Sequence, residues 1–131
     1  MDHYTALDPR FPRSFAHHGL KVYGVAFEAM VRTVELSKKI PRGYRAMADQ
    51  FKRAATAVVA AIAEGANRRT NAEKADKFAQ ARTEGGEAAA WCEMLAGLGL
   101  LDPDDLVPVV LLYERAVKML SGLIKTHGGA P

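Results

Sequence analysis

Hydrophobic residues recur at intervals of three and four along four stretches of the chain, and this spacing predicts four amphipathic helices. Turn signals separate these stretches at Pro41, near Arg69 and at Gly99. The predicted helices cover residues 20–38, 44–66, 71–98 and 103–125. Because short loops make consecutive helices antiparallel, the sequence predicts an all-α fold, an antiparallel up-down-up-down four-helix bundle over residues 20–127.

Each predicted helix has one apolar face that we expect to form the core. In chain order these faces hold Leu20, Phe27, Met30, Val31 and Val34; Met47, Phe51, Ala54, Ala55, Val58 and Ile62; Ala75, Phe78, the stem of Arg82, Gly85, Ala89, Cys92 and Leu95; and Leu106, Val109, Val110, Tyr113, Val117, Leu120 and Ile124. Gly85 and Gly86 lie in the middle of the third helix, where each costs roughly 1 kcal/mol relative to alanine. Such a pair predicts a kink or a close helix contact.

The starts of two helices carry capping signals. Thr70 and Glu73 have the spacing of a capping box before the third helix. Asp102 precedes Pro103 at the start of the fourth, where a capping carboxylate and a proline at the first helical position are both favoured. These local signals support the predicted boundaries.

The first 19 residues lack a periodic pattern and contain Pro9, Pro12 and Gly19, so we expect residues 1–19 to form an extended arm. Residues 128–131 are expected to form a short tail. The arm is consistent either with a frayed terminus or with a strap that packs on its own bundle or on a neighbouring subunit.

Length, charge and cysteine content indicate the number of domains and the location of the protein, but they do not indicate its function. The 131 residues suit one domain, and the net charge of +3 permits contact with nucleic acid without requiring it. A single cysteine, Cys92, favours a reducing, cytoplasmic location. No secretory signal is visible, and the apolar run 54–63 is shorter than the roughly 20 residues of a membrane-spanning helix. We therefore expect a cytoplasmic protein without membrane contact.

Candidate catalytic groups are scarce. The histidines lie outside the predicted helix interiors, and none belongs to a Glu-x-x-His pair of the di-iron bundles; they are His3, His17, His18 and His127. Cys92 has no histidine at helical spacing, and the glycine pairs follow no strand, as a phosphate loop would require. We expect no catalytic residue, no metal and no cofactor, and therefore a protein that is not an enzyme.

Charged residues on the second and third helices suggest two roles. Arg53, Glu64 and Glu87 are expected to form structural ion pairs that fix the helix register, with Arg53 level with residues 85–87 and Glu64 level with Lys74. A pocket around Glu64 is the alternative, because a carboxylate in a cleft could do acid–base chemistry.

The ends of the bundle differ in charge. At one end the predicted nucleic-acid-binding residues are Arg68, Arg69, Lys74 and Lys77, with Lys125 and the arm residues Arg10 and Arg13 nearby. At the other, basic and acidic residues partly cancel; they are Lys38, Lys39, Arg42 and Arg45 against Asp102, Asp104 and Asp105. Solvated helix ends are the alternative interpretation of the basic cluster.

The second helix also carries a family resemblance. Its motifs are Gln50, Arg53-Ala54-Ala55-Thr56 and Ala61-Ile62-Ala63-Glu64-Gly65-Ala66-Asn67-Arg68, followed by Phe78, Ala81, Glu87 and Leu98-Gly99 and preceded by Leu20-Lys21-Val22-Tyr23. They resemble the S23-like four-helix-bundle proteins encoded in 23S rRNA intervening sequences, and a related branch, the accessory protein of diversity-generating retroelements. This sequence departs from the family pattern at three places: Ala61 stands where the family has Asn, Thr83-Glu84 where it has Gly-Ser, and Tyr23 where it has Trp.

The resemblance implies a ring-shaped homopentamer. In the retroelement branch such rings bind nucleic acid and work with a reverse transcriptase. We therefore expect a non-enzymatic, oligomeric scaffold that binds RNA or DNA phosphates through its basic end. The alternative is a protein–protein interaction module that binds a partner protein without nucleic acid. A small-ligand protein or enzyme would instead need a deep pocket around Glu64.

Overall fold

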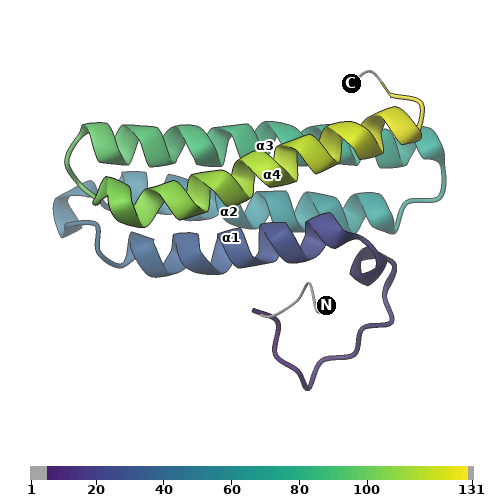
Figure 1. Cartoon of the computed structure of the whole chain (residues 1–131), viewed down its shortest axis with the longest axis horizontal. Coiled ribbons are helices and arrows are strands. Elements are labelled where there is room, and N and C mark those ends of the chain that lie inside the picture. The colour runs from purple at the N-terminus through teal and green to yellow at the C-terminus, as the bar shows by residue number, and fades with distance from the viewer. Residues whose placement is uncertain (1–5, 130–131) are drawn as a thin grey trace.

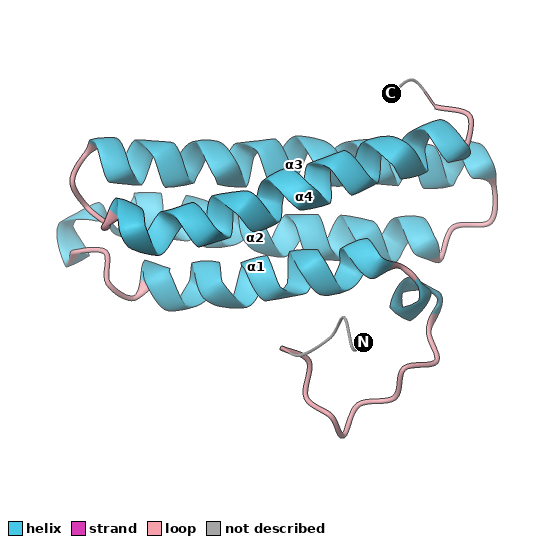
Figure 2. Cartoon of the chain, viewed as in Figure 1, coloured by secondary structure: helices cyan, strands magenta, loops and turns pink. Residues whose placement is uncertain are grey.

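The computed structural model describes residues 6–129 and contains four long α-helices (Figure 1). They are α1 (Lys21–Ser37), α2 (Arg45–Ala66), α3 (Asn71–Gly97) and α4 (Pro103–Thr126), with short 3₁₀ turns η1 (Ala16–Gly19) and η2 (Arg42–Tyr44) before α1 and α2. Over this part of the chain there is no strand (Figure 2). Each helix packs on its sequence neighbours and α4 closes against α1, which confirms the predicted all-α bundle.

The helix ends follow the local signals. The Thr70 hydroxyl accepts a hydrogen bond from the Glu73 amide at 3.1 Å, and the Asp102 carboxylate accepts one from the Asp104 amide at 2.9 Å. Beyond α3, Gly99 has a φ of 71°, and the Leu100 amide donates to the Leu95 carbonyl at 2.9 Å. This is the left-handed glycine ending that closes a helix. Local sequence signals therefore mark the starts of α3 and α4 and the end of α3.

The buried face of α1 differs from the predicted one. Its buried residues are Val22, Tyr23, Gly24, Val25, Ala26, Ala29, Thr33, Leu36 and Ser37. The predicted face is right only in part: Leu20, Phe27 and Met30 are partly buried and pack against the core, whereas Val31 is 37% exposed and Val34 is not part of the core cluster. Thr33 is buried because its hydroxyl lies 2.6 Å from the Tyr113 hydroxyl, a contact between α1 and α4.

The other three predicted faces lie mostly inside the bundle. Phe51, Ile62, Phe78, Tyr113 and Leu120 are among the largest fully buried side chains. Helix α3 continues without interruption through Gly85 and Gly86. A Cβ atom added at Gly85 would lie 3.1 Å from Val117 Cγ2, whereas one added at Gly86 would meet nothing within 4 Å. The glycine pair therefore marks a close contact between α3 and α4, and it is made at Gly85.

The arm loops away from the bundle on the far side of α1 from α3 (Figure 1). Leu7 is buried, whereas Phe11 and Phe15 are each 59% exposed. The base of the arm is attached by His17, whose ring lies 4.6 Å from that of Tyr23 and whose Nδ1 accepts from Asn67 Nδ2 at 3.3 Å. The parts of the predicted arm and tail at residues 1–5 and 130–131, with His3 among them, lie outside the described residues.

The helices are amphipathic rather than uniformly apolar. Over residues 6–129, none of them combines the length and the apolar character that a membrane-spanning segment requires.

Candidate nucleic-acid interface

The turn between α2 and α3 carries two adjacent arginines. Arg68 and Arg69 are both exposed, and within residues 6–129 neither side chain makes an ion pair or a hydrogen bond. The backbone beneath them is well held, because the Arg68 amide donates to the Gly65 carbonyl at 3.3 Å and Asn67 Nδ2 donates to the Ala63 carbonyl at 2.8 Å. Two guanidinium groups are thus presented from a fixed turn and remain available to an anionic ligand.

Gly65 brings the two helices together just before this turn. A Cβ atom at position 65 would lie 2.7 Å from Phe78 Cε1 and 3.2 Å from Lys77 Cβ, closer than ordinary van der Waals contact. Because Phe78 is itself buried, its ring has little room to retreat. The close approach of α2 and α3 therefore depends on the absence of a side chain at Gly65, and it determines where Arg68 and Arg69 lie.

Lys74 and Lys77 lie near the arginines, but each ammonium group already has a partner within the bundle. Lys74 Nζ donates to the Ala66 carbonyl at 2.9 Å, at the end of α2 where backbone carbonyls lack helical partners. Lys77 Nζ lies 2.9 Å from Glu64 Oε2, and its side chain is only 27% exposed. The structure thus brings all four predicted residues to one end of α2 and α3, with different roles.

Glu64 pairs with a different residue from the one that the sequence predicts. Counting back from a turn at Arg69 places Glu64 level with Lys74, but its ion-pair partner is Lys77. The count fixes only the level along the bundle axis, whereas the rotation of α3 brings Lys77 Cβ to within 3.2 Å of a Cβ atom added at Gly65. The Lys74 ammonium binds the Ala66 carbonyl instead. Glu64 is also a surface residue, with 49% of its side chain accessible, so it does not lie in a deep pocket.

A second set of charges links α2 and α3 further from the turn. Arg53 Nη2 lies 2.6 Å from Glu87 Oε2, and Arg53 Nη1 lies 3.3 Å from Glu84 Oε2. The hydrogen bond from Arg53 lowers the pKa of Glu87, whereas burial raises the pKa of Glu84. Sequence reasoning missed Glu84, which lies three residues before Glu87 and shares its helix face.

The antiparallel topology adds further basic residues to the end that carries Arg68 and Arg69. Lys21 begins α1 and Lys125 lies in the last turn of α4, and both are exposed. Lys21 is not among the predicted residues, although its place at the start of the first helix was a usable signal. The arm residues Arg10 and Arg13 are engaged within the arm, Arg10 by Asp8 at 2.7 Å and Arg13 by the Phe11 carbonyl at 2.7 Å.

Basic residues at the opposite end are more fully neutralised. Lys38 pairs with Glu35 at 3.0 Å, Lys39 with Asp105 at 3.6 Å and Lys52 with Asp49 at 3.5 Å. The Lys39 pair joins the α1–α2 connection to the first turn of α4, as expected if the two lie at one end of the bundle. Arg42 and Arg45 are exposed there and provide a natural comparison for the arginine pair at the other end.

Within residues 6–129 the structure shows neither a metal-binding cluster of side chains nor a reactive thiol. Over residues 6–129, no cluster of three or more His, Cys, Asp or Glu side chains is arranged to hold a metal ion. Cys92 is buried, and burial raises the pKa of its thiol to about 12. Because the thiolate is the reactive form, this thiol is a packing group rather than a nucleophile.

Known proteins share both the sequence pattern and the bundle. The model of the family described as 23S rRNA-intervening sequence protein matches residues 18–122. A crystal structure of a protein of unknown function from the S23 ribosomal protein family, from Bacteroides thetaiotaomicron VPI-5482, superposes with a TM-score of 0.74. The two chains share 24% sequence identity, over 79% of this chain and 95% of the other, so the likeness concerns the fold. No curated protein matches the chain.

Proposed function

The chain belongs to the 23S rRNA-intervening sequence protein family, and from that premise we propose that it is a non-enzymatic, oligomeric scaffold that binds RNA phosphates through the α2–α3 turn. One observation carries the proposal: Arg68 and Arg69 are adjacent, exposed and without ion-pair partners over residues 6–129. Neither the family nor the structural neighbour is described as an enzyme. A cytoplasmic location suits a protein with one buried thiol.

The chemistry of the turn favours phosphate as the ligand. A guanidinium group is planar and can donate two parallel hydrogen bonds to one phosphate, so two neighbouring arginines can bind successive phosphates of a chain. Lys74 and Lys77 lie behind them and add positive charge, although their ammonium groups are already hydrogen-bonded or ion-paired. We assign direct contacts to Arg68 and Arg69 and a supporting electrostatic role to Lys74 and Lys77.

Assembly would strengthen a site that is modest in one chain. We propose a homo-oligomer, and specifically the homopentamer implied by the family resemblance. A ring repeats the arginine pair once per subunit, and linked sites bind one polyanion far more tightly than a single site does. Several linked sites would also strengthen binding to DNA, which carries the same phosphates. They would do the same for a protein-bound nucleic acid such as the template of a reverse transcriptase.

The test compares two double variants of equal charge change. Arg68→Gln/Arg69→Gln should weaken binding of a labelled mixed-sequence RNA at least about tenfold, whereas Arg42→Gln/Arg45→Gln, at the opposite end, should leave it within about twofold. Wild-type affinity should fall steeply between about 50 mM and 200 mM salt, and the slope should decrease by about 1 for each phosphate that a variant no longer binds. Equal effects of the two double variants, or no RNA binding by purified wild-type protein, would refute the proposal.

A protein-interaction module is the second candidate function. It is favoured by an apolar groove between α3 and α4 that leaves Val107 and Leu111 more than half exposed. A partner that stays bound to the wild-type chain after nuclease treatment, combined with no RNA binding by the purified protein, would support this alternative over the RNA scaffold.

A further inference from the structure

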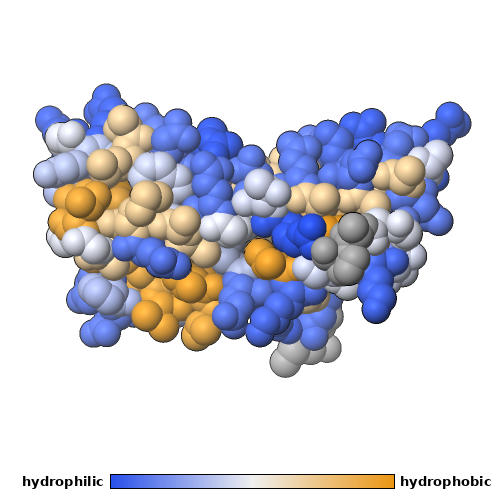
Figure 3. Space-filling model, turned by 90° about the horizontal axis from the view of Figure 1, so that it is seen from above, coloured by the Kyte–Doolittle hydropathy of each residue, from blue (hydrophilic) through white to orange (hydrophobic). Residues whose placement is uncertain are grey.

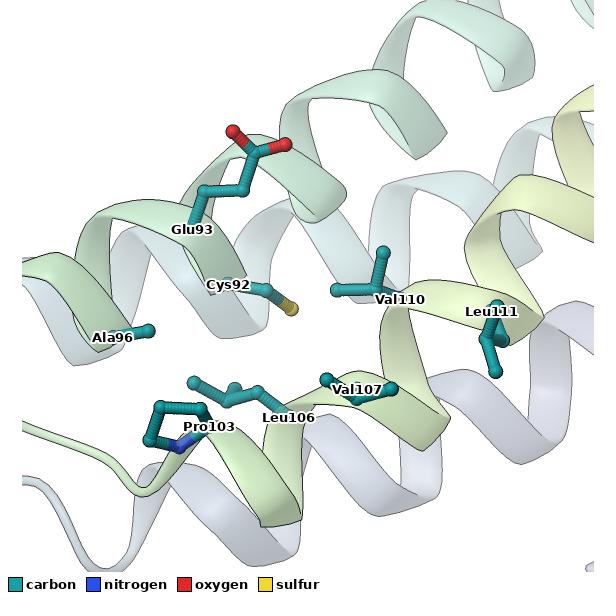
Figure 4. A pocket seen from close by; sticks show the side chains of 8 residues that line it. All are labelled: Cys92, Glu93, Ala96, Pro103, Leu106, Val107, Val110 and Leu111. Carbon is teal, nitrogen blue, oxygen red and sulfur yellow. The ribbon is translucent and has the colours of Figure 1, made fainter.

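An apolar groove lies at the end of the bundle opposite the arginine pair. It has a volume of about 250 Å³ and lies between the C-terminal part of α3 and the N-terminal part of α4 (Figure 4). Its main lining residues are Ala96 from α3 and Pro103, Leu106, Val107, Val110 and Leu111 from α4. Glu93 stands at its edge, and its carboxylate points away from the apolar side chains (Figure 4).

The surface around this groove is also apolar. Two of its lining side chains, Val107 and Leu111, are 54% and 57% exposed, and they are two of the eight large hydrophobic side chains exposed over residues 6–129. Figure 3 shows apolar residues gathered on this half of the α3–α4 face, while the other half is mainly hydrophilic. An exposed apolar patch of this kind commonly marks an interaction surface.

The same chain carries a segment with matching chemistry. Phe11 and Phe15 in the arm are each 59% exposed. An apolar cavity of about 150 Å³ can hold a benzene ring, so the groove has room for a phenyl side chain. Arg10 and Arg13 flank Phe11; Asp8 pairs with Arg10, so these two arginines and one aspartate give residues 6–19 a net charge of +1. Glu93 lines the groove, and Asp102 and Asp104 are the chain neighbours of its lining residue Pro103.

The arm cannot reach the groove of its own chain while its base is in place. The contact of His17 with Asn67 holds that base at the end where α1 begins, whereas the groove lies near the other end of the bundle. Helix α1 alone is about 25 Å long at 1.5 Å per residue. The six residues from His17 back to Phe11 extend at most about 22 Å. The arm also lies on the opposite side of α1 from α3 (Figure 1).

We propose that Phe11 of one copy inserts its ring into the α3–α4 groove of a second copy of this chain, and that Phe15, whose ring stacks on His17 at the base of the arm, packs on the exposed apolar surface beside that groove. The contact is head-to-tail, because the arm of each copy leaves one end of the bundle and the groove opens near the other. Contacts of this type close into rings when the rotation between copies allows it. The inference rests on the oligomeric part of the proposed function and is independent of RNA binding.

Two complementary variants test the contact. Phe11→Ser/Phe15→Ser removes both phenyl rings, and Val107→Gln/Leu111→Arg blocks the groove with a long cation that repels the basic arm. All four positions are more than half exposed, so both variants should keep the helical circular dichroism of the wild type. Without RNA, the wild type should sediment as an oligomer and each variant alone as a monomer.

An equimolar mixture of the two variants gives the decisive result. Only one intact arm and one intact groove can meet in the mixture, so it should form a dimer and nothing larger. Tyr44→Ser removes an exposed aromatic ring from η2 instead and should assemble like the wild type. A monomeric wild type, assembly of either variant alone, or a mixture that stays monomeric would overturn the inference. Monomeric variants that still bind RNA separate this outcome from failure of the proposed function.

Discussion

Replacing Gly65 with alanine tests the tight contact that positions the arginine turn. The added methyl group would lie 2.7 Å from Phe78 Cε1 and 2.9 Å from Phe78 Cδ1. Phe78 is 1% exposed, so its ring can move only by displacing other core side chains. Overpacking of this kind costs about 1–3 kcal/mol. Alanine regains about 1 kcal/mol through its higher helix propensity, so we expect a net destabilisation of about 0–2 kcal/mol.

Gly86→Ala is the matched control. It makes the same chemical change in the middle of α3, where an added Cβ atom meets nothing within 4 Å. Only the propensity gain remains, so this variant should be stabilised by about 1 kcal/mol. For a chain of this length, 1 kcal/mol corresponds to roughly 4 °C in melting temperature. Gly65→Ala should therefore melt roughly 4–12 °C below Gly86→Ala and no higher than the wild type.

Thermal unfolding followed by circular dichroism measures this difference in melting temperature. Repeating the measurement in a chain that also carries Phe78→Leu tests whether the Phe78 ring causes it. In a Phe78→Leu chain the ring atoms that clash are absent, so adding Gly65→Ala should no longer destabilise. The difference between the effect of Gly65→Ala in the wild type and its effect in the Phe78→Leu chain measures the coupling between positions 65 and 78. The reasoning is refuted if Gly65→Ala stabilises the wild type as much as Gly86→Ala does, or if its destabilising effect is unchanged in the Phe78→Leu background.

Three further predictions concern buried or partly buried groups. Tyr113→Phe leaves the Thr33 hydroxyl buried without its partner and should cost about 1–3 kcal/mol in urea unfolding; adding Thr33→Val should recover most of that stability, and no recovery would contradict the pairing. The Cys92 thiol, with its pKa raised to about 12, should resist iodoacetamide in the folded protein and react on unfolding, as mass spectrometry would show. Burial and His18 lower the pKa of His17, so its contact with Asn67 should stabilise the fold above the ordinary pKa of 6.5, and this stability should disappear as pH falls through the lowered pKa; an NMR midpoint at or above the ordinary value would contradict this.

Features encoded within a few residues were predictable from the sequence. The caps at Thr70 and Asp102 and the glycine at Gly99 depend only on neighbouring backbone groups, and all three mark helix ends in the structure. The orientation of α1 was not predictable in the same way. Thr33 carries a polar hydroxyl, which does not mark it as a core residue. Its burial depends on Tyr113, which lies 80 positions further along the chain.

The candidate site, too, has features that the sequence predicts and features that depend on tertiary packing. Topology alone brings Arg68, Arg69, Lys74 and Lys77 to one end of the bundle. The engagement of Lys74 with the Ala66 carbonyl depends on side-chain geometry that spacing does not encode. Val107 and Leu111 lie off the predicted apolar face of α4 and are exposed, but the groove was missed because its shape depends on how α3 and α4 pack together.

Arg53 allows the register between α2 and α3 to be tested through pH. It lies between Glu87 at 2.6 Å and Glu84 at 3.3 Å, and its removal would leave two carboxylates together without their cation. The wild-type contact lowers the pKa of Glu87, so the stability it contributes is present at neutral pH and disappears as pH falls through that lowered pKa. Arg53→Met should therefore destabilise most near neutral pH.

Comparing urea unfolding at about pH 7 and about pH 4 isolates this effect, because protonation removes the repulsion between the two carboxylates. The difference between wild type and Arg53→Met should shrink at the lower pH. Lys118→Met is the control: Lys118 pairs with Glu114 at 3.6 Å within α4, and both side chains are at least 60% exposed. Such a pair contributes little, so its removal should have a small effect at either pH. If Arg53→Met behaves like Lys118→Met, the Arg53 cluster does not fix the register of the two helices, and the α2–α3 alignment must rest on the close packing at Gly65.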